Sequence, residues 1–414
     1  MSGNGGAIGP GDTIWLRGGT YTGLWNISVS GALGSGDNNI GGKIIFRNYN
    51  CERAILDSGT TSGFVLTVNG SYVWIWGLEI TKSQPNPDSL NDKPGVAHGN
   101  PVGSKVINCY IHNNTGNGIS AFSGWTNAEF YGNVIYYNGR TPNAGPNYAY
   151  GVYTQNSTGN GKDYRNNIIW GNWGNYPTHS YTGTPGNLSN IRWYRNVTFK
   201  ANNSGAGSWN LFGGSGSTTG HVFDSNYVYS YDVTDGVYDL GGHNAYGGAA
   251  GSIVTNNYFG RGKVWHARNN SGTTYTGNRH FGEKVDFTNS TCATCSTYDG
   301  NIDYSSTPTA NWGPFVQPNS YEPGYGFVVV FNWTNASSVN ADLSSILSAG
   351  DSFKIIDAQN PFGPPIVTGT YGGGMVAIPT TSTAIAAPTS VPSGRNTPSH
   401  TPQNGIHVWL VRKV

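Results

Sequence analysis

The sequence is poor in charge and has no long apolar runs. Only 10% of its 414 residues are charged, and the formal net charge is +1. A chain with so little net charge predicts no broad basic surface for nucleic acid or for an anionic membrane. No apolar run reaches the length of a transmembrane helix. We therefore expect a partner that is neither a nucleic acid nor a membrane.

The amino-terminal residues also lack the features of a secretory signal peptide. Residues 1–15 have neither a basic start nor an apolar core. The first strand pattern begins abruptly at residue 11, with no segment before it that reads as a cap over the core. We expect a mature fragment, a truncated chain, or an end that another chain covers.

Cysteine is scarce, with only four residues, Cys51, Cys109, Cys292 and Cys295. The last two have CxxC spacing. Zinc would need two further ligands, and the sequence has no second CxxC. A redox CxxC would need a βαβ context, which the sequence does not predict. We expect structural thiols or a local disulfide.

Glycine and aromatic residues are abundant instead. There are 62 glycines, and aromatics make up 13% of the chain. Disordered chains have few aromatics and many charges, so this composition argues against disorder. It suits a rigid all-β protein with exposed rings.

A repeat carries the organisation of the chain. Asparagine followed by a short apolar strand recurs every 25 to 34 residues, starting at Asn108, Asn133, Asn167, Asn196, Asn226 and Asn257. Strands and turns carry this period without any helical pattern, which is typical of a β-solenoid. Asparagines at one turn position can bond from coil to coil as a ladder, and they tolerate the left-handed backbone of sharp corners.

The opening segments extend this pattern. Residues 11–57 contain GDTIWLRGGTYTG, then KIIFRNYN, then AILDSG. This order is similar to the opening of many β-helix polysaccharide enzymes. Over residues 8–305 the chain resembles the right-handed parallel β-helix proteins, which include pectate-lyase-like polysaccharide lyases, glycoside hydrolases and phage tailspike depolymerases. The resemblance implies an all-β, right-handed parallel β-helix.

From about residue 323 the pattern changes. Strand-like runs at 327–333, 352–356, 365–369 and 406–411 are separated by turn signals, and no asparagine repeat continues. We predict a small antiparallel β-sandwich, similar to the accessory domains of glycan-active enzymes. The expected domains are therefore a β-helix over 1–322 and a sandwich over 323–414.

A second column of strands predicts the functional face. It comprises residues 119–122, 152–155, 178–181, 210–213, 237–240 and 264–267. Strand side chains alternate, so if Val152 points inward, Tyr153 points outward, and His179 and Tyr181 follow the same rule. The expected substrate-binding residues on or beside this face are Phe122, Tyr148, Tyr150, Gln155, Trp209, Asn210 and Phe212. Rings stack on pyranose faces, although rings on a solenoid can also stack with no ligand.

Two chemistries remain open at this face. In a lyase, His179 would be the base, Tyr153 or Tyr181 the acid, and Arg192 or Lys162 the partner of a uronate carboxylate. A hydrolase would need two carboxylates, and the candidates are Asp232, Asp235 and Asp239, with Asp224 nearby. The same aspartates could bind Ca²⁺ or cap turns. Glu79, Glu129 and Asp163 read as solvated or turn residues.

The resemblance supplies no catalytic residue. Polygalacturonase-type hydrolases carry Asn-Thr-Asp, Asp-Asp, Gly-His-Gly and Arg-Ile-Lys motifs in order, and this sequence has no such series. The arginine and calcium-aspartate motifs of pectate lyases cannot be matched either. The site is therefore predicted from the repeat alone.

These observations favour an extracellular or cell-surface enzyme, a lyase or a glycoside hydrolase, that binds a linear glycan along the outer face. The alternative is a non-catalytic adhesive β-helix, or a tailspike-like protein of a virion. The self-contained coils favour a monomer over a trimer.

Overall fold

The computed structural model describes residues 7–34, 41–85, 94–140, 150–157, 161–174, 177–183, 188–200, 210–214, 218–231, 236–240, 249–266, 271–285 and 295–414. Within these ranges the chain forms β-strands and one short 3₁₀ turn, η1 (Tyr49–Cys51), and no α-helix. None of the described segments is an apolar helix of membrane-spanning length.

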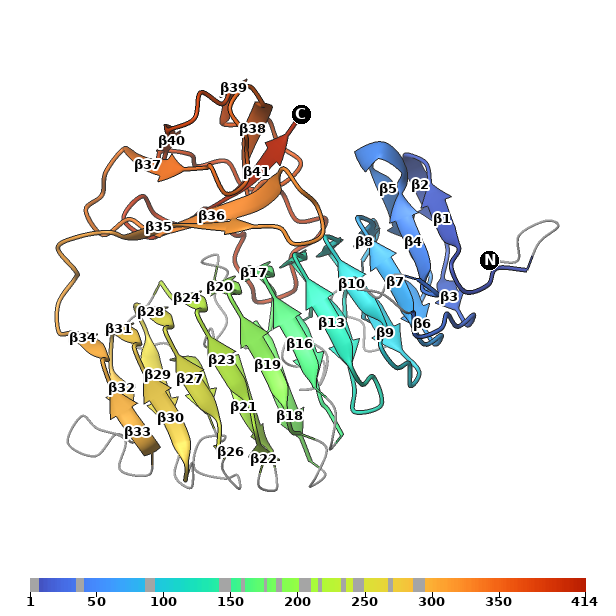
Figure 1. Cartoon of the computed structure of the whole chain (residues 1–414), viewed down its shortest axis with the longest axis horizontal. Helices are drawn as coiled ribbons and strands as arrows, with labels where there is room; N and C mark the ends of the chain where they lie inside the picture. The colour runs from blue at the N-terminus through green and yellow to red at the C-terminus, as the bar shows by residue number, and fades with distance from the viewer. Residues whose placement is uncertain are drawn as a thin grey trace.

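Three parallel sheets wind together into one β-helix, and each coil except the last contributes a strand to each sheet in turn (Figure 1). Sheet A contains β1 (Thr13–Leu16), β4 (Ile44–Asn48), β7 (Val73–Trp76), β10 (Lys105–Ile107), β13 (Ala128–Tyr131), β16 (Lys162–Arg165), β19 (Ile191–Tyr194), β23 (Val222–Asp224), β27 (Ile253–Thr255), β30 (Thr273–Thr276) and β33 (Cys295–Asp299). Sheet B contains β2 (Gly19–Thr22), β5 (Ala54–Asp57), β8 (Glu79–Thr81), β11 (Tyr110–His112), β14 (Val134–Tyr136), β17 (Ile168–Trp170), β20 (Val197–Phe199), β24 (Tyr227–Tyr229), β28 (Tyr258–Gly260), β31 (Arg279–Phe281) and β34 (Ile302–Tyr304). Sheet C contains β3 (Trp25–Ile27), β6 (Leu66–Val68), β9 (Val96–His98), β12 (Ile119–Ala121), β15 (Val152–Thr154), β18 (Thr178–Thr182), β21 (Asn210–Gly214), β25 (Gly236–Leu240), β29 (Lys263–His266) and β32 (Lys284–Val285). A minor pair joins β22 (Thr218–Thr219) and β26 (Ala249–Ala250).

The interior of the β-helix is a continuous column of apolar side chains from successive coils. In sheet A, Phe130, Tyr164 and Trp193 are in register on adjacent strands and are buried. Their rings stack with centroid distances of 4.7 and 4.0 Å. A single coil could not bury such rings alone, so stacking of the coils creates the core.

An asparagine ladder runs along the corner between sheets A and B, as the repeat predicts. Each side-chain oxygen accepts from the backbone and side-chain N–H groups of the preceding member, and each side-chain amide also donates to a backbone carbonyl. The ladder comprises Asn133, Asn167, Asn196, Asn226, Asn257, Asn278 and Asn301. Asn108 does not begin it, contrary to prediction. The backbone N–H of Cys109 donates to Asn133 instead, and Asn108 occupies the preceding corner residue with φ 51°.

The chain after the β-helix forms antiparallel sheets. The larger contains β35 (Trp312–Pro318), β36 (Tyr325–Phe331), β41 (Ile406–Lys413), β38 (Ser352–Asp357) and β39 (Val367–Thr370) in this spatial order. The smaller pairs β37 (Ser338–Asp342) with β40 (Met375–Pro379). These sheets confirm the predicted all-β carboxyl-terminal part. Because β35 pairs with β36, the larger sheet begins before residue 323, where the sequence placed the boundary.

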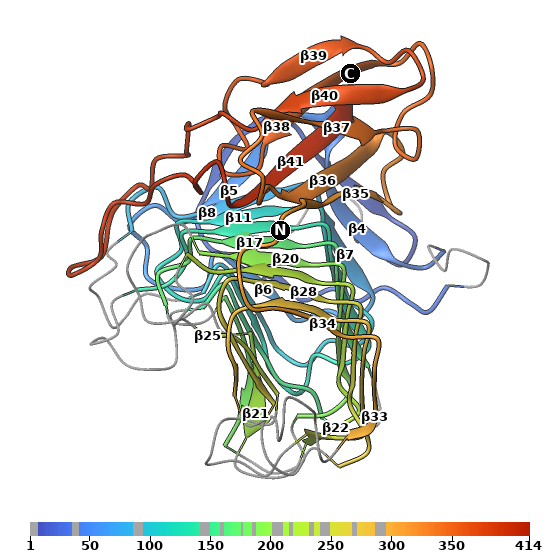
Figure 2. The same ribbon diagram turned by 90° about the vertical axis from the view of Figure 1, so that its left-hand side faces the viewer.

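The five-stranded sheet lies across sheet B, as Figure 2 shows in a view along the β-helix. One of its faces shares an apolar cluster with sheet B. Tyr136, Trp170 and Phe199 contribute from sheet B, and Phe331 and Leu410 contribute from the carboxyl-terminal sheet. The other face packs on the β37–β40 pair. The carboxyl-terminal sheet is therefore an integral part of the fold that leaves sheets A and C as the outer faces of the β-helix.

Candidate functional site

The register of sheet C confirms the predicted second column of strands from β12 to β18. Tyr153 pairs with Ser120 on one side and with His179 on the other. The alternate positions Val152, Thr154 and Thr178 have 0% exposure, so they face the interior. Tyr153 and His179 therefore project from the outer face of the sheet.

Aromatic side chains gather around His179 on this face. We call Phe122, Tyr150, Tyr153, His179 and Tyr181 the His179 cluster. The imidazole lies 4.4 Å from the ring of Tyr150, 5.5 Å from Tyr153 and 5.1 Å from Tyr181, measured between ring centroids. The ring of Phe122 is 5.4 Å from Tyr153. Five of the predicted site residues are thus brought together, as the alternation implies.

The centre of the cluster is withdrawn from solvent, which sets the protonation of His179, while Phe122 is 38% exposed. His179 and Tyr153 are each 8% exposed. Burial lowers the pKa of His179 to about 3, so the imidazole is neutral at physiological pH. The Tyr153 hydroxyl donates to the carbonyl oxygen of Tyr181 at 3.1 Å and accepts from the side-chain amide of Gln155 at 2.8 Å. The cluster therefore combines a neutral imidazole with an oriented phenol.

Sequence reasoning missed His98, which extends the cluster toward β9. Its Nδ1 donates to the Gly99 carbonyl, and its Nε2 accepts from the backbone N–H of Phe122. Its ring contacts Phe122 and Trp125. Burial, together with the nearby Lys162, lowers its pKa to about 4. The pairing of β9 with β12 places His98 here, and the Val-Ala-His run is the sequence signal that could have found it.

The register places two predicted substrate-binding residues on β21 opposite residues of β18. Asn210 pairs with Thr178 and Phe212 pairs with Ser180, which are interior positions with 0% exposure. The residue opposite His179 is Leu211, and a substrate-binding role for Asn210 and Phe212 stays a prediction. Tyr148 and Trp209, predicted beside them, lie outside the described residues.

The predicted acidic site is described only in part. Asp239 lies on β25 opposite Leu211, in the row of His179, and is buried. Asp232 and Asp235 lie outside the described residues. Within the ranges that the structure describes, no three or more acidic, histidine or cysteine side chains form a group that could hold a metal. Calcium binding by these aspartates stays a prediction.

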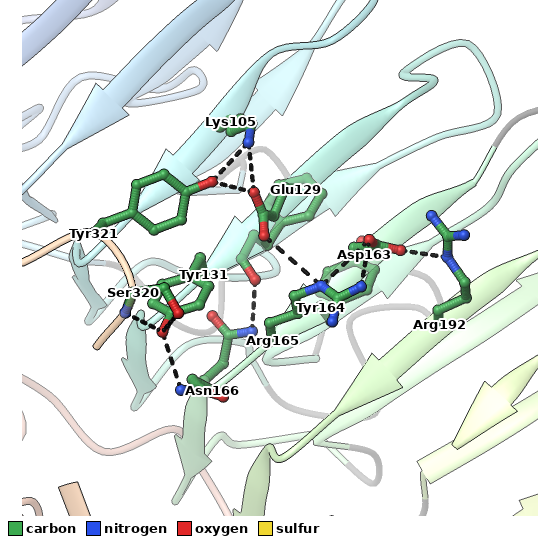
Figure 3. Close-up of polar contacts among 12 residues, drawn as sticks. Lys105, Glu129, Tyr131, Asp163, Tyr164, Arg165, Asn166, Arg192, Ser320 and Tyr321 are labelled. Carbon is green, nitrogen blue, oxygen red and sulfur yellow. Dashed lines mark hydrogen bonds and ion pairs between the residues drawn. The ribbon is translucent and has the colours of Figure 1, made fainter. Parts of the chain in front are cut away.

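Neither cation proposed for a uronate carboxylate lies in the cluster. Arg192 belongs to β19 of sheet A, where its Nε donates to Asp163 at 2.5 Å (Figure 3). Lys162 is fully buried, and its ammonium donates to the carbonyl oxygens of Ala121, Phe122 and Gln155 at 3.0, 2.8 and 2.5 Å. Arg192 therefore belongs to another sheet and Lys162 is held inside the coil, and a pairing of either with a uronate carboxylate stays a prediction.

The acidic residues read as solvated are in fact partnered. Glu129 accepts from Lys105 at 2.7 Å and from the Tyr321 hydroxyl, and Arg165 bridges toward Asp163 at 3.0 Å (Figure 3). Tyr321 belongs to the loop between β35 and β36, so this network fastens the carboxyl-terminal sheet to sheet A.

Glu79 was likewise misread. It is 4% exposed and binds Arg53 at 2.5 and 2.9 Å, with His112 at 3.0 Å. Among the cysteines, Cys51 and Cys109 are free thiols and Cys295 is disulfide-bonded, while Cys292 lies outside the described residues.

Comparison with known proteins identifies the β-helix. No curated protein matches the chain in sequence. Among solved structures, the pectate lyase Pel9A shares 16% identity over 73% of this chain and 76% of that chain, with a TM-score of 0.49. An alginate lyase from Paenibacillus sp. str. FPU-7 shares 17% identity over 72% and 90%, with a TM-score of 0.36. The Streptococcus pneumoniae surface protein and adhesin PfbA shares 10% over 70% and 83%, with a TM-score of 0.46.

These matches thus include polysaccharide lyases as well as an adhesin. A family match is more direct. Residues 5–226, more than half of the chain, match the family described as Pel9A-like, right handed beta helix region. The chain therefore belongs to the family with a Pel9A-like right-handed β-helix region.

Proposed function

We propose that the protein is a polysaccharide lyase that binds an acidic linear glycan along the outer face of sheet C. The observation that carries this proposal is the position of His179 among rings on that face. An unprotonated imidazole can accept a proton, and aromatic rings suit the apolar faces of pyranoses. The family match to a Pel9A-like β-helix supports the same class of reaction.

In the proposed reaction, His179 takes the C5 proton of a uronate residue. The electron pair of that C–H bond forms a C4–C5 double bond, and the glycosidic oxygen leaves C4 with a proton from an acid. Tyr181 suits the acid, because it stacks on the imidazole at 5.1 Å and is only partly buried. Tyr153 suits a positioning role, because Gln155 and the Tyr181 carbonyl hold its hydroxyl.

The test is a panel of polygalacturonate, alginate and a neutral glucan, each with and without Ca²⁺. Unsaturated product absorbance and new reducing ends are measured together. We expect both signals to rise on an acidic polymer, and His179→Ala to abolish both. His407→Ala is the matched control, since His407 is also a buried histidine but belongs to β41 of the carboxyl-terminal sheet. Arg192→Gln should also retain activity, because Arg192 pairs with Asp163 on sheet A.

Other results would reassign the chemistry. Reducing ends without absorbance would indicate a hydrolase and return attention to Asp232, Asp235 and Asp239. Activity that survives His179→Ala would refute His179 as the base.

A second candidate is a non-catalytic glycan-binding protein. The observation that favours it is the 8% exposure of both His179 and Tyr153, which suits packing within a rigid binding face. Retained glycan binding with no product from any polymer would select this function. For either function we infer a secreted or surface location and a monomer, which cell fractionation and light scattering can test. A tailspike-like role would instead give a trimer.

A further inference from the structure

We propose that the cavity between sheet B and the carboxyl-terminal sheet binds a small sugar acid through its carboxylate. This interface cavity has a volume of about 240 Å³. A water molecule takes about 30 Å³ of liquid, so the cavity has room for a single sugar-sized ligand. Its walls come from both parts of the chain, with Arg53, Glu79 and Tyr110 on one side and Lys354, Phe362 and Arg412 on the other.

Two cations from adjacent strands face this cavity. Lys354 on β38 and Arg412 on β41 are direct partners in the antiparallel register, and both line the cavity. Like charges directly opposite each other on paired strands are unfavourable. An anion between them would remove that repulsion.

The carboxylates of the cavity are largely satisfied by other groups. Glu79 binds Arg53 and His112, and Glu52 binds Arg17, at 2.8 Å, from outside the cavity. The remaining carboxylate in the lining is that of Glu322, which accepts from Asn108 at 3.0 Å. The remaining cations are Lys354 and Arg412. Once these pairs are set aside, two cations of the interface cavity, Lys354 and Arg412, are opposed by one carboxylate, Glu322.

Arg412 also has unused donor capacity. Its Nη2 donates to the Tyr110 hydroxyl at 2.5 Å, and its guanidinium lies 4.7 Å from the centroid of the Tyr325 ring. Its Nε is buried and has no hydrogen-bond partner. Buried N–H groups in folded proteins are normally satisfied. Because this Nε is not open to the cavity, a bound carboxylate would pair with the charge of the guanidinium group rather than with this atom.

The remaining walls suit a sugar rather than a bare inorganic anion. Pro361 and Ile356 give the wall an apolar part, on which the C–H face of a pyranose can pack, while the Arg53 guanidinium already lies 3.8 Å from the centroid of the neighbouring Phe362 ring. The carboxylate of Glu322 can accept from a sugar hydroxyl. The ligand class is therefore a monosaccharide with a carboxylate.

The experiment is calorimetric titration of the full chain with galacturonate, with galactose and inorganic phosphate as comparison ligands. We expect galacturonate to bind and galactose to bind at least tenfold more weakly, because it lacks the charge. Lys354→Gln should weaken galacturonate binding by roughly 10-fold to 100-fold, since it removes a charge-assisted contact. Lys413→Gln is the matched control. Lys413 follows Arg412 on β41 and pairs with Asp351, so this variant removes the same charge from a residue that does not line the cavity.

Each contrary result overturns the proposal. Galacturonate that does not bind, or that binds no better than galactose, would refute a carboxylate site. Equal losses of galacturonate affinity in the Lys354→Gln and Lys413→Gln variants would show that binding depends on the overall charge of the protein and not on the cavity. Phosphate binding as tight as galacturonate would refute the assignment to a sugar acid. The proposed lyase activity on sheet C stands or falls separately.

Discussion

Replacing Asn196 with alanine should destabilise the β-helix more than a typical polar substitution. Asn196 is 1% exposed and lies in the middle of the ladder. Its side-chain oxygen accepts from the backbone N–H and the side-chain amide of Asn167 at 3.0 and 2.9 Å. Its own amide donates to the Tyr164 carbonyl at 2.9 Å and to Asn226 at 3.0 Å. Alanine removes all of these bonds at once.

The magnitude follows from what the substitution leaves behind. The backbone N–H of Asn167 loses its acceptor inside the corner, and an orphaned buried donor costs roughly 1–3 kcal/mol. The amide of Asn167 keeps a bond to the Phe130 carbonyl, so its loss is smaller. With roughly 1 kcal/mol for each of the two bonds that the Asn196 amide donates, the free energy of unfolding should fall by about 3–5 kcal/mol.

Equilibrium urea denaturation followed by tryptophan fluorescence measures this difference. Asn340→Ala is the control, because Asn340 is an exposed strand residue, and it should change the stability by less than about 0.5 kcal/mol. A loss below about 1 kcal/mol for Asn196→Ala would refute the reasoning, since it would mean that water or a backbone shift satisfies the freed groups.

Two further predictions concern the junction between the β-helix and the carboxyl-terminal sheet. Burial acts to raise the pKa of the Glu79 carboxyl, but hydrogen bonds with His112 and Arg53 hold that pKa below its ordinary value of 4.5. The contribution of Glu79 to stability is therefore present above about pH 4.5 and is lost as the pH falls through the folded-state pKa. Glu79→Gln should therefore cost about 2 kcal/mol at neutral pH and less at about pH 3, as measured by urea denaturation at both pH values; a pH-independent difference would contradict this. Phe331→Ala should cost about 3–5 kcal/mol, because Phe331 is fully buried between Trp312 and Trp333. Met375→Ala, at a residue that is 71% exposed, should leave the denaturation midpoint unchanged, and equal effects of the two would rule out the apolar junction as the cause.

Much of the fold could be predicted because its signal is local and repeated. The spacing of Asn133, Asn167 and Asn196 reports the coil length directly, and the ladder confirms it. The repeat did not identify where the ladder begins. Asn108 and Cys109 are adjacent in sequence, and only the structure shows that the backbone N–H of Cys109 is the group that donates to Asn133. The docking of the carboxyl-terminal sheet was not predicted, since apolar residues on sheet B look the same whether they face inward or a partner sheet.

The candidate site was predicted where alternation alone decides it. Tyr153, His179 and Tyr181 follow from the period of two. Polarity alone does not assign Asn210 to one face of this sheet, because Thr178, the interior residue opposite it, is itself polar and buried. Alternation does not place Arg192 either, because residues close in sequence to sheet C belong to the next sheet around the coil, here β19 of sheet A.

The position of the carboxyl-terminal sheet has a consequence for how the molecule unfolds. In a bare solenoid each coil interacts only with its neighbours, so the ends can fray and unfolding can spread coil by coil. Here one sheet contacts coils from Tyr110 on β11 to Phe281 on β31. Opening any of these coils disturbs a layer that the others share. The molecule should therefore behave as one cooperative unit along this length, and a pulling force applied along its axis should produce one large rupture rather than a staircase of small ones.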